Sequence, residues 1–253
     1  MSSATPVALI TGGTAGLGAA TARLLAQDGM RVAVNYHSDS GRAAGLIKEL
    51  HDLSPLPHDE SNFVSFRADL GVRNDLVLLV NGVVAAMGRL DAVFSNGGWT
   101  KIRDINDLDD NVDEEDWDRC FNMNVKSHLF LMHAAKEHLD KTEGVFITTA
   151  SLAGVKVSGS SLAYAVTKAA QIHLAKGLAL AASPRIRVNS VSPGLMLTGW
   201  GLSFPEEKRK EMSDRTKLGR LVTVEDVAQQ VLCFIKSKTV TGVNAVLDAG
   251  MSI

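Results

Sequence analysis

Short apolar runs alternate with longer helical segments along this chain. Runs rich in β-branched and aromatic residues predict strands, because such side chains suit a pleated, half-buried surface. The predicted strands are 7–10, 31–35, 63–68, 90–96, 144–151, 185–191 and 244–250. Segments with helical periodicity predict helices, and these are 19–27, 42–53, 114–139, the segment around Tyr164 and 224–236. The segment 54–61 carries two prolines and predicts a loop.

This alternation of strands and helices predicts the fold class. Apolar strands separated by helices are typical of a parallel sheet that is covered on both faces, with right-handed crossovers. The 253 residues are enough to bury a substantial core, and the chain shows no internal repeat, low-complexity tract or interdomain linker. We therefore predict one α/β domain over residues 1–253, a doubly wound parallel seven-stranded sheet of the Rossmann type.

Composition and charge exclude several classes of protein. With 26 basic and 28 acidic residues the formal charge is −2, which argues against a protein that binds nucleic acid by neutralising phosphates. No apolar run reaches the ~18 residues that a membrane helix needs. Cys120 and Cys233 fall in predicted helices and suit buried free thiols better than a disulfide. The N-terminal residues show no signal-peptide pattern before the first strand, so we expect a reduced, cytoplasmic protein.

A glycine-rich turn follows the first predicted strand. In TGGTAGLG, Gly12, Gly16 and Gly18 have the spacing GxxxGxG. Glycines tolerate backbone angles that other residues avoid, and they let a phosphate approach the main chain. The next helix points its free N–H groups and its positive end at the same place. The segment is either a cradle for a dinucleotide pyrophosphate or a structural turn, and the α/β alternation favours the cradle.

The end of the second strand bears on the choice of cofactor. In NAD sites an acidic side chain near this point usually holds the ribose 2′-hydroxyl. Here the strand ends at Asn35, and no carboxylate follows until Asp39. Side chains of Asn35, His37, Ser38 and Arg42 could donate to a 2′-phosphate, so the pattern favours NADP(H) over NAD(H).

Asp69 ends the third predicted strand and has two interpretations. Its carboxylate is placed to accept a hydrogen bond from the amine of an adenine ring. It is equally well placed to cap the N-terminus of a following helix.

Tyr164 and Lys168 are the strongest candidates for chemistry. Four residues apart in a predicted helix, they lie on one face, a turn from each other. A free phenol titrates near ~10, and a nearby ammonium lowers that pKa by stabilising the phenolate. The lowered pKa would suit Tyr164 to general acid–base work. Ser151 ends the fifth strand, and Asn124 lies in the helix after the fourth. The alternative interpretation is that the Tyr–Lys pair are ordinary helix side chains without a catalytic role.

These motifs, in this order and over nearly the whole chain, resemble the short-chain dehydrogenase/reductase family. The family pattern TGxxxGxG matches residues 11–18, and its catalytic Asn, Ser, Tyr and Lys match Asn124, Ser151, Tyr164 and Lys168. The resemblance implies that Tyr164 exchanges the proton and that Ser151 holds the substrate carbonyl. It also implies that Lys168 binds the nicotinamide ribose and that Asn124 anchors a water molecule in a proton path.

The resemblance extends to the segment after the sixth strand. Pro193 and Gly194 match a proline–glycine pair of the family, and Thr198 takes the position that usually touches the nicotinamide amide. The family element NNAG appears here as Ser-Asn-Gly-Gly at 95–98, and we expect glycine in place of alanine to preserve the turn while loosening it. An Asp-Gly-Gly pattern near the C-terminus appears as Asp-Ala-Gly at 248–250.

The candidate site residues fall into two sets. The catalytic set is Asn124, Ser151, Tyr164 and Lys168. The cofactor-binding set is Gly12, Thr14, Gly16, Leu17, Gly18, Asn35, His37, Ser38, Asp69, Leu70, Asn96, Gly97, Tyr164, Lys168, Pro193, Gly194, Met196 and Thr198. No metal site is predicted, because His128, His133 and His138 recur every five residues and therefore do not share a helix face.

The resemblance implies an oxidoreductase that moves a hydride between NADP(H) and the ketone or secondary alcohol of a hydrophobic small molecule, with Tyr164 as general acid and base. Two other functions stay open: a non-redox isomerase or cyclase, and a dinucleotide-binding sensor, both on the same fold. The segment 195–215, with Met196, Trp200 and Phe204, predicts either a movable lid over the substrate or a loop packed on the body.

Two expectations concern the surface. Family members are commonly tetramers, which implies a homo-oligomer, either a tetramer or a dimer. The alanine-rich run 169–182 offers small side chains for close packing against a second copy or against its own sheet. The strongly acidic segment 104–119 favours a solvated loop and an acidic helix start over a cation site.

Overall fold

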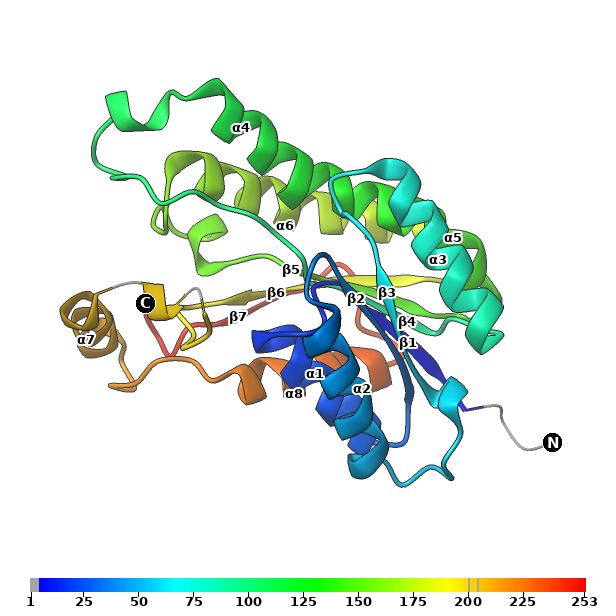
Figure 1. Ribbon diagram of the computed structural model, residues 1–253. Coiled ribbons are helices and arrows are strands. Elements are labelled where there is room, and N and C mark those ends of the chain that lie inside the picture. The colour runs from blue at the N-terminus through cyan, green and yellow to red at the C-terminus, as the bar shows by residue number, and fades with distance from the viewer. Residues whose placement is uncertain (1–4, 200, 204) are drawn as a thin grey trace.

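The computed structural model describes residues 5–199, 201–203 and 205–253. At its centre is a parallel sheet in the strand order β3-β2-β1-β4-β5-β6-β7 (Figure 1). The strands are β1 (Val7–Ile10), β2 (Arg31–Tyr36), β3 (Phe63–Arg67), β4 (Ala92–Ser95), β5 (Val145–Thr149), β6 (Arg187–Pro193) and β7 (Asn244–Leu247). The predicted parallel sheet of seven strands is confirmed, although β4 and β7 are shorter than predicted.

Helices cover both faces of this sheet. The α-helices are α1 (Gly16–Gln27), α2 (Ser40–Leu53), α3 (Arg73–Met87), α4 (Glu114–Phe121), α5 (Ser127–Thr142), α6 (Leu162–Ala182), α7 (Glu206–Arg215) and α8 (Val224–Lys236). On one face α1, α2 and α8 pack, and on the other α3, α5 and α6 (Figure 1). Successive residues of β1 alternate between these two cores, Leu9 joining the second and Ile10 the first. None of the described helices is long and apolar enough to cross a bilayer.

The order of the strands reverses between β1 and β4. β1 pairs with β2 on one side and with β4 on the other, and such a switch point opens a crevice at the carboxyl ends of the strands. The glycine turn after β1 meets the segment after β4 at this edge. A Cβ atom built on Gly12 would lie 3.3 Å from the Cα atom of Gly97. Two segments that are far apart in the sequence therefore lie in contact at the base of this crevice.

The predicted helix over 114–139 is confirmed as a helical segment from Glu114 to Thr142, but a π turn that the sequence did not predict divides it. After α4 comes a π-helical turn, η3 (Asn122–Lys126), and α5 then continues to Thr142. A π turn adds one residue to the helical ladder and is frequent at functional sites. Here it buries Asn124 completely, with its side chain against Trp99 and Thr167. Side-chain periodicity alone does not reveal such an insertion.

Two smaller differences concern the helices. The sequence patterns do not identify α3, whose buried side contributes Leu76, Val80 and Val83 to the core. Cys120 is buried as predicted, but Cys233 is exposed, so the prediction of two buried thiols is wrong for the second. α8 turns Val231 and its neighbours inward instead. Both thiols are free, as predicted.

Asn35 has a structural role that the sequence does not reveal. Its side chain is buried, and its Oδ1 accepts a hydrogen bond from the N–H of Gly12 at 3.2 Å. Its Nδ2 donates to the carbonyl of Ala68 at 3.1 Å. The amide thus ties the glycine turn to the ends of β2 and β3. Because the side chain is buried and its amide group is engaged with the main chain, it does not reach outward as a phosphate donor, which corrects the prediction for Asn35.

We predict that Asn35→Ala destabilises the fold. The substitution leaves the N–H of Gly12 and the carbonyl of Ala68 without their partner, which costs about 1–3 kcal/mol of the free energy of unfolding. Urea denaturation followed by circular dichroism measures the change. Asn106→Ala, at an exposed loop position, is the control and should change the free energy of unfolding by less than ~0.5 kcal/mol. Equal midpoints for the two variants would contradict this role of Asn35.

Candidate active site

The glycine turn after β1 forms a cradle for an anion. Gly12 and Gly16 have φ angles of +56° and +47°, which favour glycine. A Cβ atom on Gly18 would lie 2.3 Å from the carbonyl oxygen of Gly12, so this position has no room for a side chain. Ala15, which precedes α1, offers no side-chain cap to the first amides of the helix. The start of α1 therefore keeps donors and a positive dipole end for a group such as a pyrophosphate.

The predicted contact residues around this cradle lie at the same edge of the sheet. Thr14 is partly exposed inside the turn, whereas Leu17 is buried beneath it. The Nδ2 of Asn96 donates to the carbonyl of Gly12 at 3.3 Å. A Cβ on Gly97 would lie 2.1 Å from Cδ1 of Leu70, so glycine here makes room for that leucine. The expectation that this glycine preserves the turn while loosening it stays a prediction.

The segment after β6 arches over the cradle. Pro193 is the last residue of β6, and the N–H of Gly194 donates to the carbonyl of Leu247 on β7 at 2.8 Å. Further along, the methyl carbon of Thr198 lies 3.0 Å from the place a Cβ of Gly16 would take. Met196 forms a short bridge with residue 222 between these two points. The predicted lid residues Trp200 and Phe204 lie outside the described residues.

Tyr164 and Lys168 stand at the start of α6, opposite the end of β5. The helix is capped by Ser161, whose Oγ accepts from the N–H of Tyr164 at 3.2 Å. Ser151, two residues after β5, forms a side-chain hydrogen bond with the phenol of Tyr164. Lys168 is 3% exposed, and its Nζ lies 5.5 Å from the centroid of the tyrosine ring. The structure thus brings the hydroxyl, phenol and amine of the predicted catalytic set together.

Burial controls the titration of this pair. It raises the pKa of the Tyr164 phenol, and the hydrogen bond with Ser151 opposes that rise. It also lowers the pKa of the Lys168 ammonium to about 7. The prediction that the phenol has a lowered pKa is therefore wrong for this structure, because desolvation disfavours the charged form of each group. Tyr164 stays protonated at neutral pH, as a proton donor must be.

Asn124 uses its side-chain amide to hold a loop. Its Oδ1 accepts from the N–H of Trp99 at 2.8 Å, and its Nδ2 donates to the carbonyl of the same residue at 2.8 Å. A second donation reaches Oγ1 of Thr167 on α6 at 3.1 Å. The π turn therefore connects the segment after β4 to the helix of Tyr164. The water-anchoring role implied for Asn124 stays a prediction.

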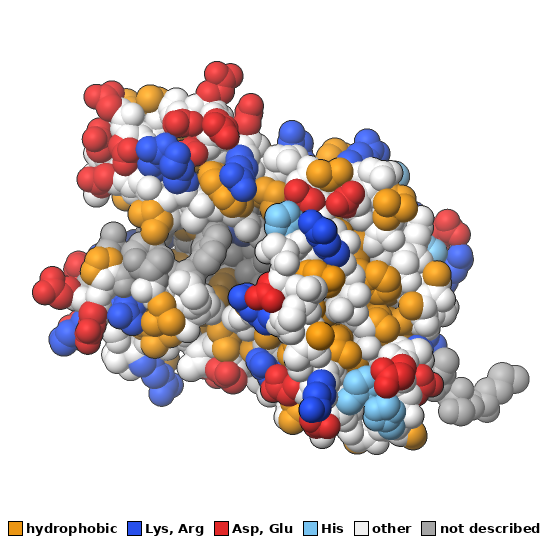
Figure 2. All heavy atoms as spheres, viewed as in Figure 1, with side chains coloured by type: hydrophobic (Ala, Val, Ile, Leu, Met, Phe, Trp, Pro, Cys, Tyr) orange, Lys and Arg blue, Asp and Glu red, His pale blue; other side chains and the backbone are white. Residues whose placement is uncertain are grey.

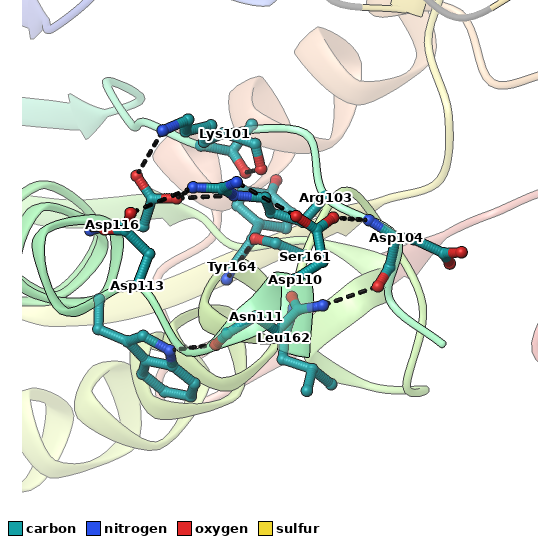
Figure 3. A network of polar contacts seen from close by, with 12 residues as sticks. Lys101, Arg103, Asp104, Asp110, Asn111, Asp113, Asp116, Ser161, Leu162 and Tyr164 are labelled. Atoms are coloured by element: carbon teal, nitrogen blue, oxygen red, sulfur yellow. Dashed lines mark hydrogen bonds and ion pairs between the residues drawn. The ribbon is translucent and has the colours of Figure 1, made fainter. Parts of the chain in front are cut away.

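The acidic segment braces the start of α6 (Figure 3). Arg103 lies among carboxylates and donates to Asp116 at 2.6 Å. Asn111, in the same segment, accepts from the N–H of Leu162 at 2.9 Å, which satisfies one of the first amides of the helix. The segment begins α4 with acidic residues, as predicted, but its loop is ordered around a guanidinium. The acidic segment and Arg103 thus contact the residues that begin the helix of Tyr164.

The carboxyl ends of β2 and β3 form a polar surface beside the cradle. Asp69 accepts from the N–H of Gly71 at 2.8 Å and lies 3.7 Å from Nε2 of His37. Because α3 is preceded by Val72, Asp69 is not its N-cap, which removes one of the two interpretations. Arg67, which sequence reasoning missed, donates to the carbonyl of His37 at 3.1 Å. Only the register of β3 beside β2 brings this cation there.

A cavity of about 100 Å³ has Leu152, the residue after Ser151, in its wall. Its walls come from the residues after Ser151, the segment after β6, α7 and the C-terminal residues, and they are mostly apolar. The apolar lining residues include Leu152, Val157, Leu195, Met212, Val222 and Met251. Figure 2 shows acidic side chains gathered over α4 and the loop before it. The cavity suits an apolar group of a small ligand.

Comparison with known proteins identifies the family of this chain. A family profile described as enoyl-(acyl carrier protein) reductase matches residues 12–252. The 3-oxoacyl-[acyl-carrier-protein] reductase FabG of Thermotoga maritima is 33% identical, covering 98% of this chain and 98% of its own length. Secoisolariciresinol dehydrogenase of Forsythia intermedia is also 33% identical, covering 98% of this chain and 89% of its own.

Solved structures give the same result. A short-chain dehydrogenase/reductase from Serratia marcescens superposes with a TM-score of 0.87 at 27% identity, covering 98% of both chains. The NADPH-dependent 3-quinuclidinone reductase of Rhodotorula rubra gives 0.86 at 26% identity, covering 99% of this chain and 92% of its own. With the glycine cradle, the Ser–Tyr–Lys cluster and the sheet order on which they stand, the chain belongs to the short-chain dehydrogenase/reductase family of oxidoreductases.

Proposed function

We propose that this protein transfers a hydride between NADP(H) and the ketone or secondary alcohol of a hydrophobic small molecule. The observation that carries the proposal is the cluster of Ser151, Tyr164 and Lys168 at the same sheet edge as an anion cradle. A mostly apolar cavity that begins at Leu152, the residue after Ser151, supports a hydrophobic substrate. Relatives named as reductases and dehydrogenases of carbonyl and alcohol compounds support it.

The residues divide the chemistry between them. The dinucleotide supplies or accepts the hydride when it is bound. The uncapped start of α1 would hold its pyrophosphate, and the ammonium of Lys168 would donate to its ribose. Ser151 donates a hydrogen bond to the substrate carbonyl oxygen, and Tyr164 donates its proton to that oxygen as negative charge develops there. In the direction of oxidation, the phenolate form of Tyr164 accepts the proton of the alcohol.

The surface beside β2 supports the preference for NADP(H). The carboxylate expected of an NAD site is absent from residues 35–38. Asp39 instead caps α2 and pairs with Arg42 at 2.9 Å, so its charge is already matched. His37 and Ser38 are exposed at this edge, next to Arg67. Donors and a cation at this point suit a 2′-phosphate better than a bare hydroxyl.

The two other functions predict different results in an activity assay. An isomerase or cyclase would convert its substrate without consuming nicotinamide, and a sensor would bind the dinucleotide without forming any product. Absorbance of the reduced nicotinamide at ~340 nm, together with mass spectrometry over a panel of apolar ketones and secondary alcohols, separates the three. The proposed function requires that product and oxidised cofactor form in equal amounts.

Tyr164→Phe should abolish turnover and leave cofactor binding intact. The variant keeps the ring and its packing but removes the proton donor, and the loss of general acid catalysis lowers kcat by about 10²–10⁴. Steady-state kinetics and a fluorescence titration with NADPH measure the two effects. Tyr36→Phe, at the one other tyrosine of the chain, is the matched control and keeps kcat near wild type. Wild-type turnover in Tyr164→Phe refutes the assignment.

Ser38→Asp should reverse the cofactor preference. A carboxylate at the end of β2 repels a 2′-phosphate and accepts from a 2′-hydroxyl, so the Kd for NADPH rises by about tenfold or more, or ~1.4 kcal/mol, while that for NADH does not rise. Thr239→Asp adds the same charge at an exposed site before β7 and should change neither value. A wild-type protein that binds NADH more tightly than NADPH would overturn the preference.

We also propose that the protein is a homo-oligomer, either a dimer or a tetramer. The outer side of α6 exposes Leu180 by 83% and Val166 by 44%, and Leu129 of α5 is also exposed, which a second copy would cover. Light scattering should give the mass of a dimer or tetramer, and Leu180→Glu should shift it toward the monomer. A monomer mass for the wild type would contradict the expectation.

A further inference from the structure

A chain of four buried polar side chains runs behind the catalytic lysine. Nζ of Lys168 lies 2.9 Å from Oε1 of Gln171, whose Nε2 lies 3.0 Å from Nε2 of His128. The other ring nitrogen, Nδ1, lies 2.6 Å from Oγ of Ser95. None of the four is more than 3% exposed. They come from α6, α5 and β4, so the chain crosses from the helix of Tyr164 to the sheet.

The chemistry of these groups allows one direction of hydrogen bonding. The ammonium of Lys168 has no acceptor, so the carboxamide of Gln171 must turn its oxygen toward it. Its NH₂ group then faces the carbonyl of Thr149, at 3.1 Å, and the ring of His128. The reverse orientation would set NH₂ against NH₃⁺ and two oxygens against each other. Lys168 therefore donates to Gln171, and Gln171 donates to His128.

This direction fixes the tautomer of His128. Its Nε2 receives an N–H from Gln171 and must carry a lone pair, so the proton lies on Nδ1 and is donated to Ser95. A doubly protonated ring would turn N–H against N–H. Burial and the charge of Lys168 agree, because together they lower the pKa of His128 to about 3. The imidazole is neutral at any pH at which an enzyme of this kind works.

We propose that Gln171, oriented by His128 and Ser95, is a positioning residue that holds the Lys168 ammonium in place and protonated beside Tyr164. The inference rests on the proposed function for its catalytic consequence, but the hydrogen-bond chain itself does not. With Gln171 and the carbonyl of Thr149, at 2.7 Å, as acceptors, two of the three ammonium donors are occupied. One is left for the cofactor side of the site.

The environment of Lys168 explains why such a residue is needed. Among the described residues, the titratable groups that face this ammonium are Tyr164 on its own helix, the thiol of Cys120 on α4 and the neutral ring of His128 on α5. None of these is a carboxylate. The charge is therefore stabilised by dipoles alone, and two neutral oxygens replace the counter-ion. Hydrogen bonds that polarise one another along the chain strengthen this hold.

Gln171→Met tests the catalytic consequence. Methionine keeps the length of the side chain but offers no strong acceptor, so the ammonium loses its proton at lower pH. The descending alkaline limb of kcat/KM for ketone reduction should move to lower pH by on the order of one unit. The same shift should appear in the pH dependence of the Kd for NADPH. Gln171→Glu keeps an acceptor for Lys168, so its kcat/KM should not begin to fall at a lower pH than that of the wild type.

Gln229→Met, at an exposed position of α8, is the matched control and should leave the pH profile unchanged. A purely structural role for Gln171 would lower stability or the amount of folded enzyme without moving the limb. If Gln171→Met is folded and its kcat/KM falls at the same alkaline pH as that of the wild type, the proposal is overturned.

The tautomer of His128 tests the proposed hydrogen-bond chain without any assay of activity. In wild-type protein labelled with [15N]histidine, the resonance that is missing from His128→Phe should report a neutral ring protonated at Nδ1 from about pH 5 to pH 9. A ring protonated at Nε2, or one that titrates in this range, overturns the proposed orientation of Gln171. If the expected tautomer is seen but Tyr164→Phe keeps its turnover, the proposed function fails and the hydrogen-bond chain stands.

Discussion

The buried ammonium of Lys168 is the constraint on which the rest of the site depends. Removing a cation from water is costly unless other dipoles replace the lost solvation, and here a main-chain carbonyl and a carboxamide do so. Both acceptors lie on the inner side of the lysine. The ammonium is thereby held against β5 and does not swing into solvent, and its remaining donor is available to the cleft beside Tyr164.

The fold brings these groups to a cofactor cradle because parallel strands end at one edge of the sheet. β1 ends at the glycine turn, β4 ends at the segment beneath it, and β5 ends two residues before Ser151. α6 then starts beside this edge, and its first turn is held by the ordered acidic segment around Arg103. A helix anchored at its N-terminus keeps Tyr164 and Lys168 in register with the strand ends. The geometry of the site is therefore a property of the sheet and of this brace together.

The sequence predicted what is local and periodic. The apolar runs predict the strands, and the spacing of Gly12, Gly16 and Gly18 and of Tyr164 and Lys168 is contained in single turns or helices. The roles of Asn35, Arg67 and Gln171 depend on contacts between distant segments, which spacing along the chain does not encode. The pKa of Tyr164 was misjudged for the same reason, since the pair alone says nothing of how far the fold removes each group from water. One clue was available: Gln171 and His128 are polar residues at core-facing helix positions, where a buried partner is required.

A structure of the protein with NADP⁺ and a product alcohol tests the central claim most directly. The account predicts that the alcohol oxygen lies within about 2.6–3.2 Å of both Oη of Tyr164 and Oγ of Ser151, and that Nζ of Lys168 donates to the nicotinamide ribose while still bound to Gln171. An alcohol oxygen held by other residues, with Tyr164 turned away from it, would contradict the account.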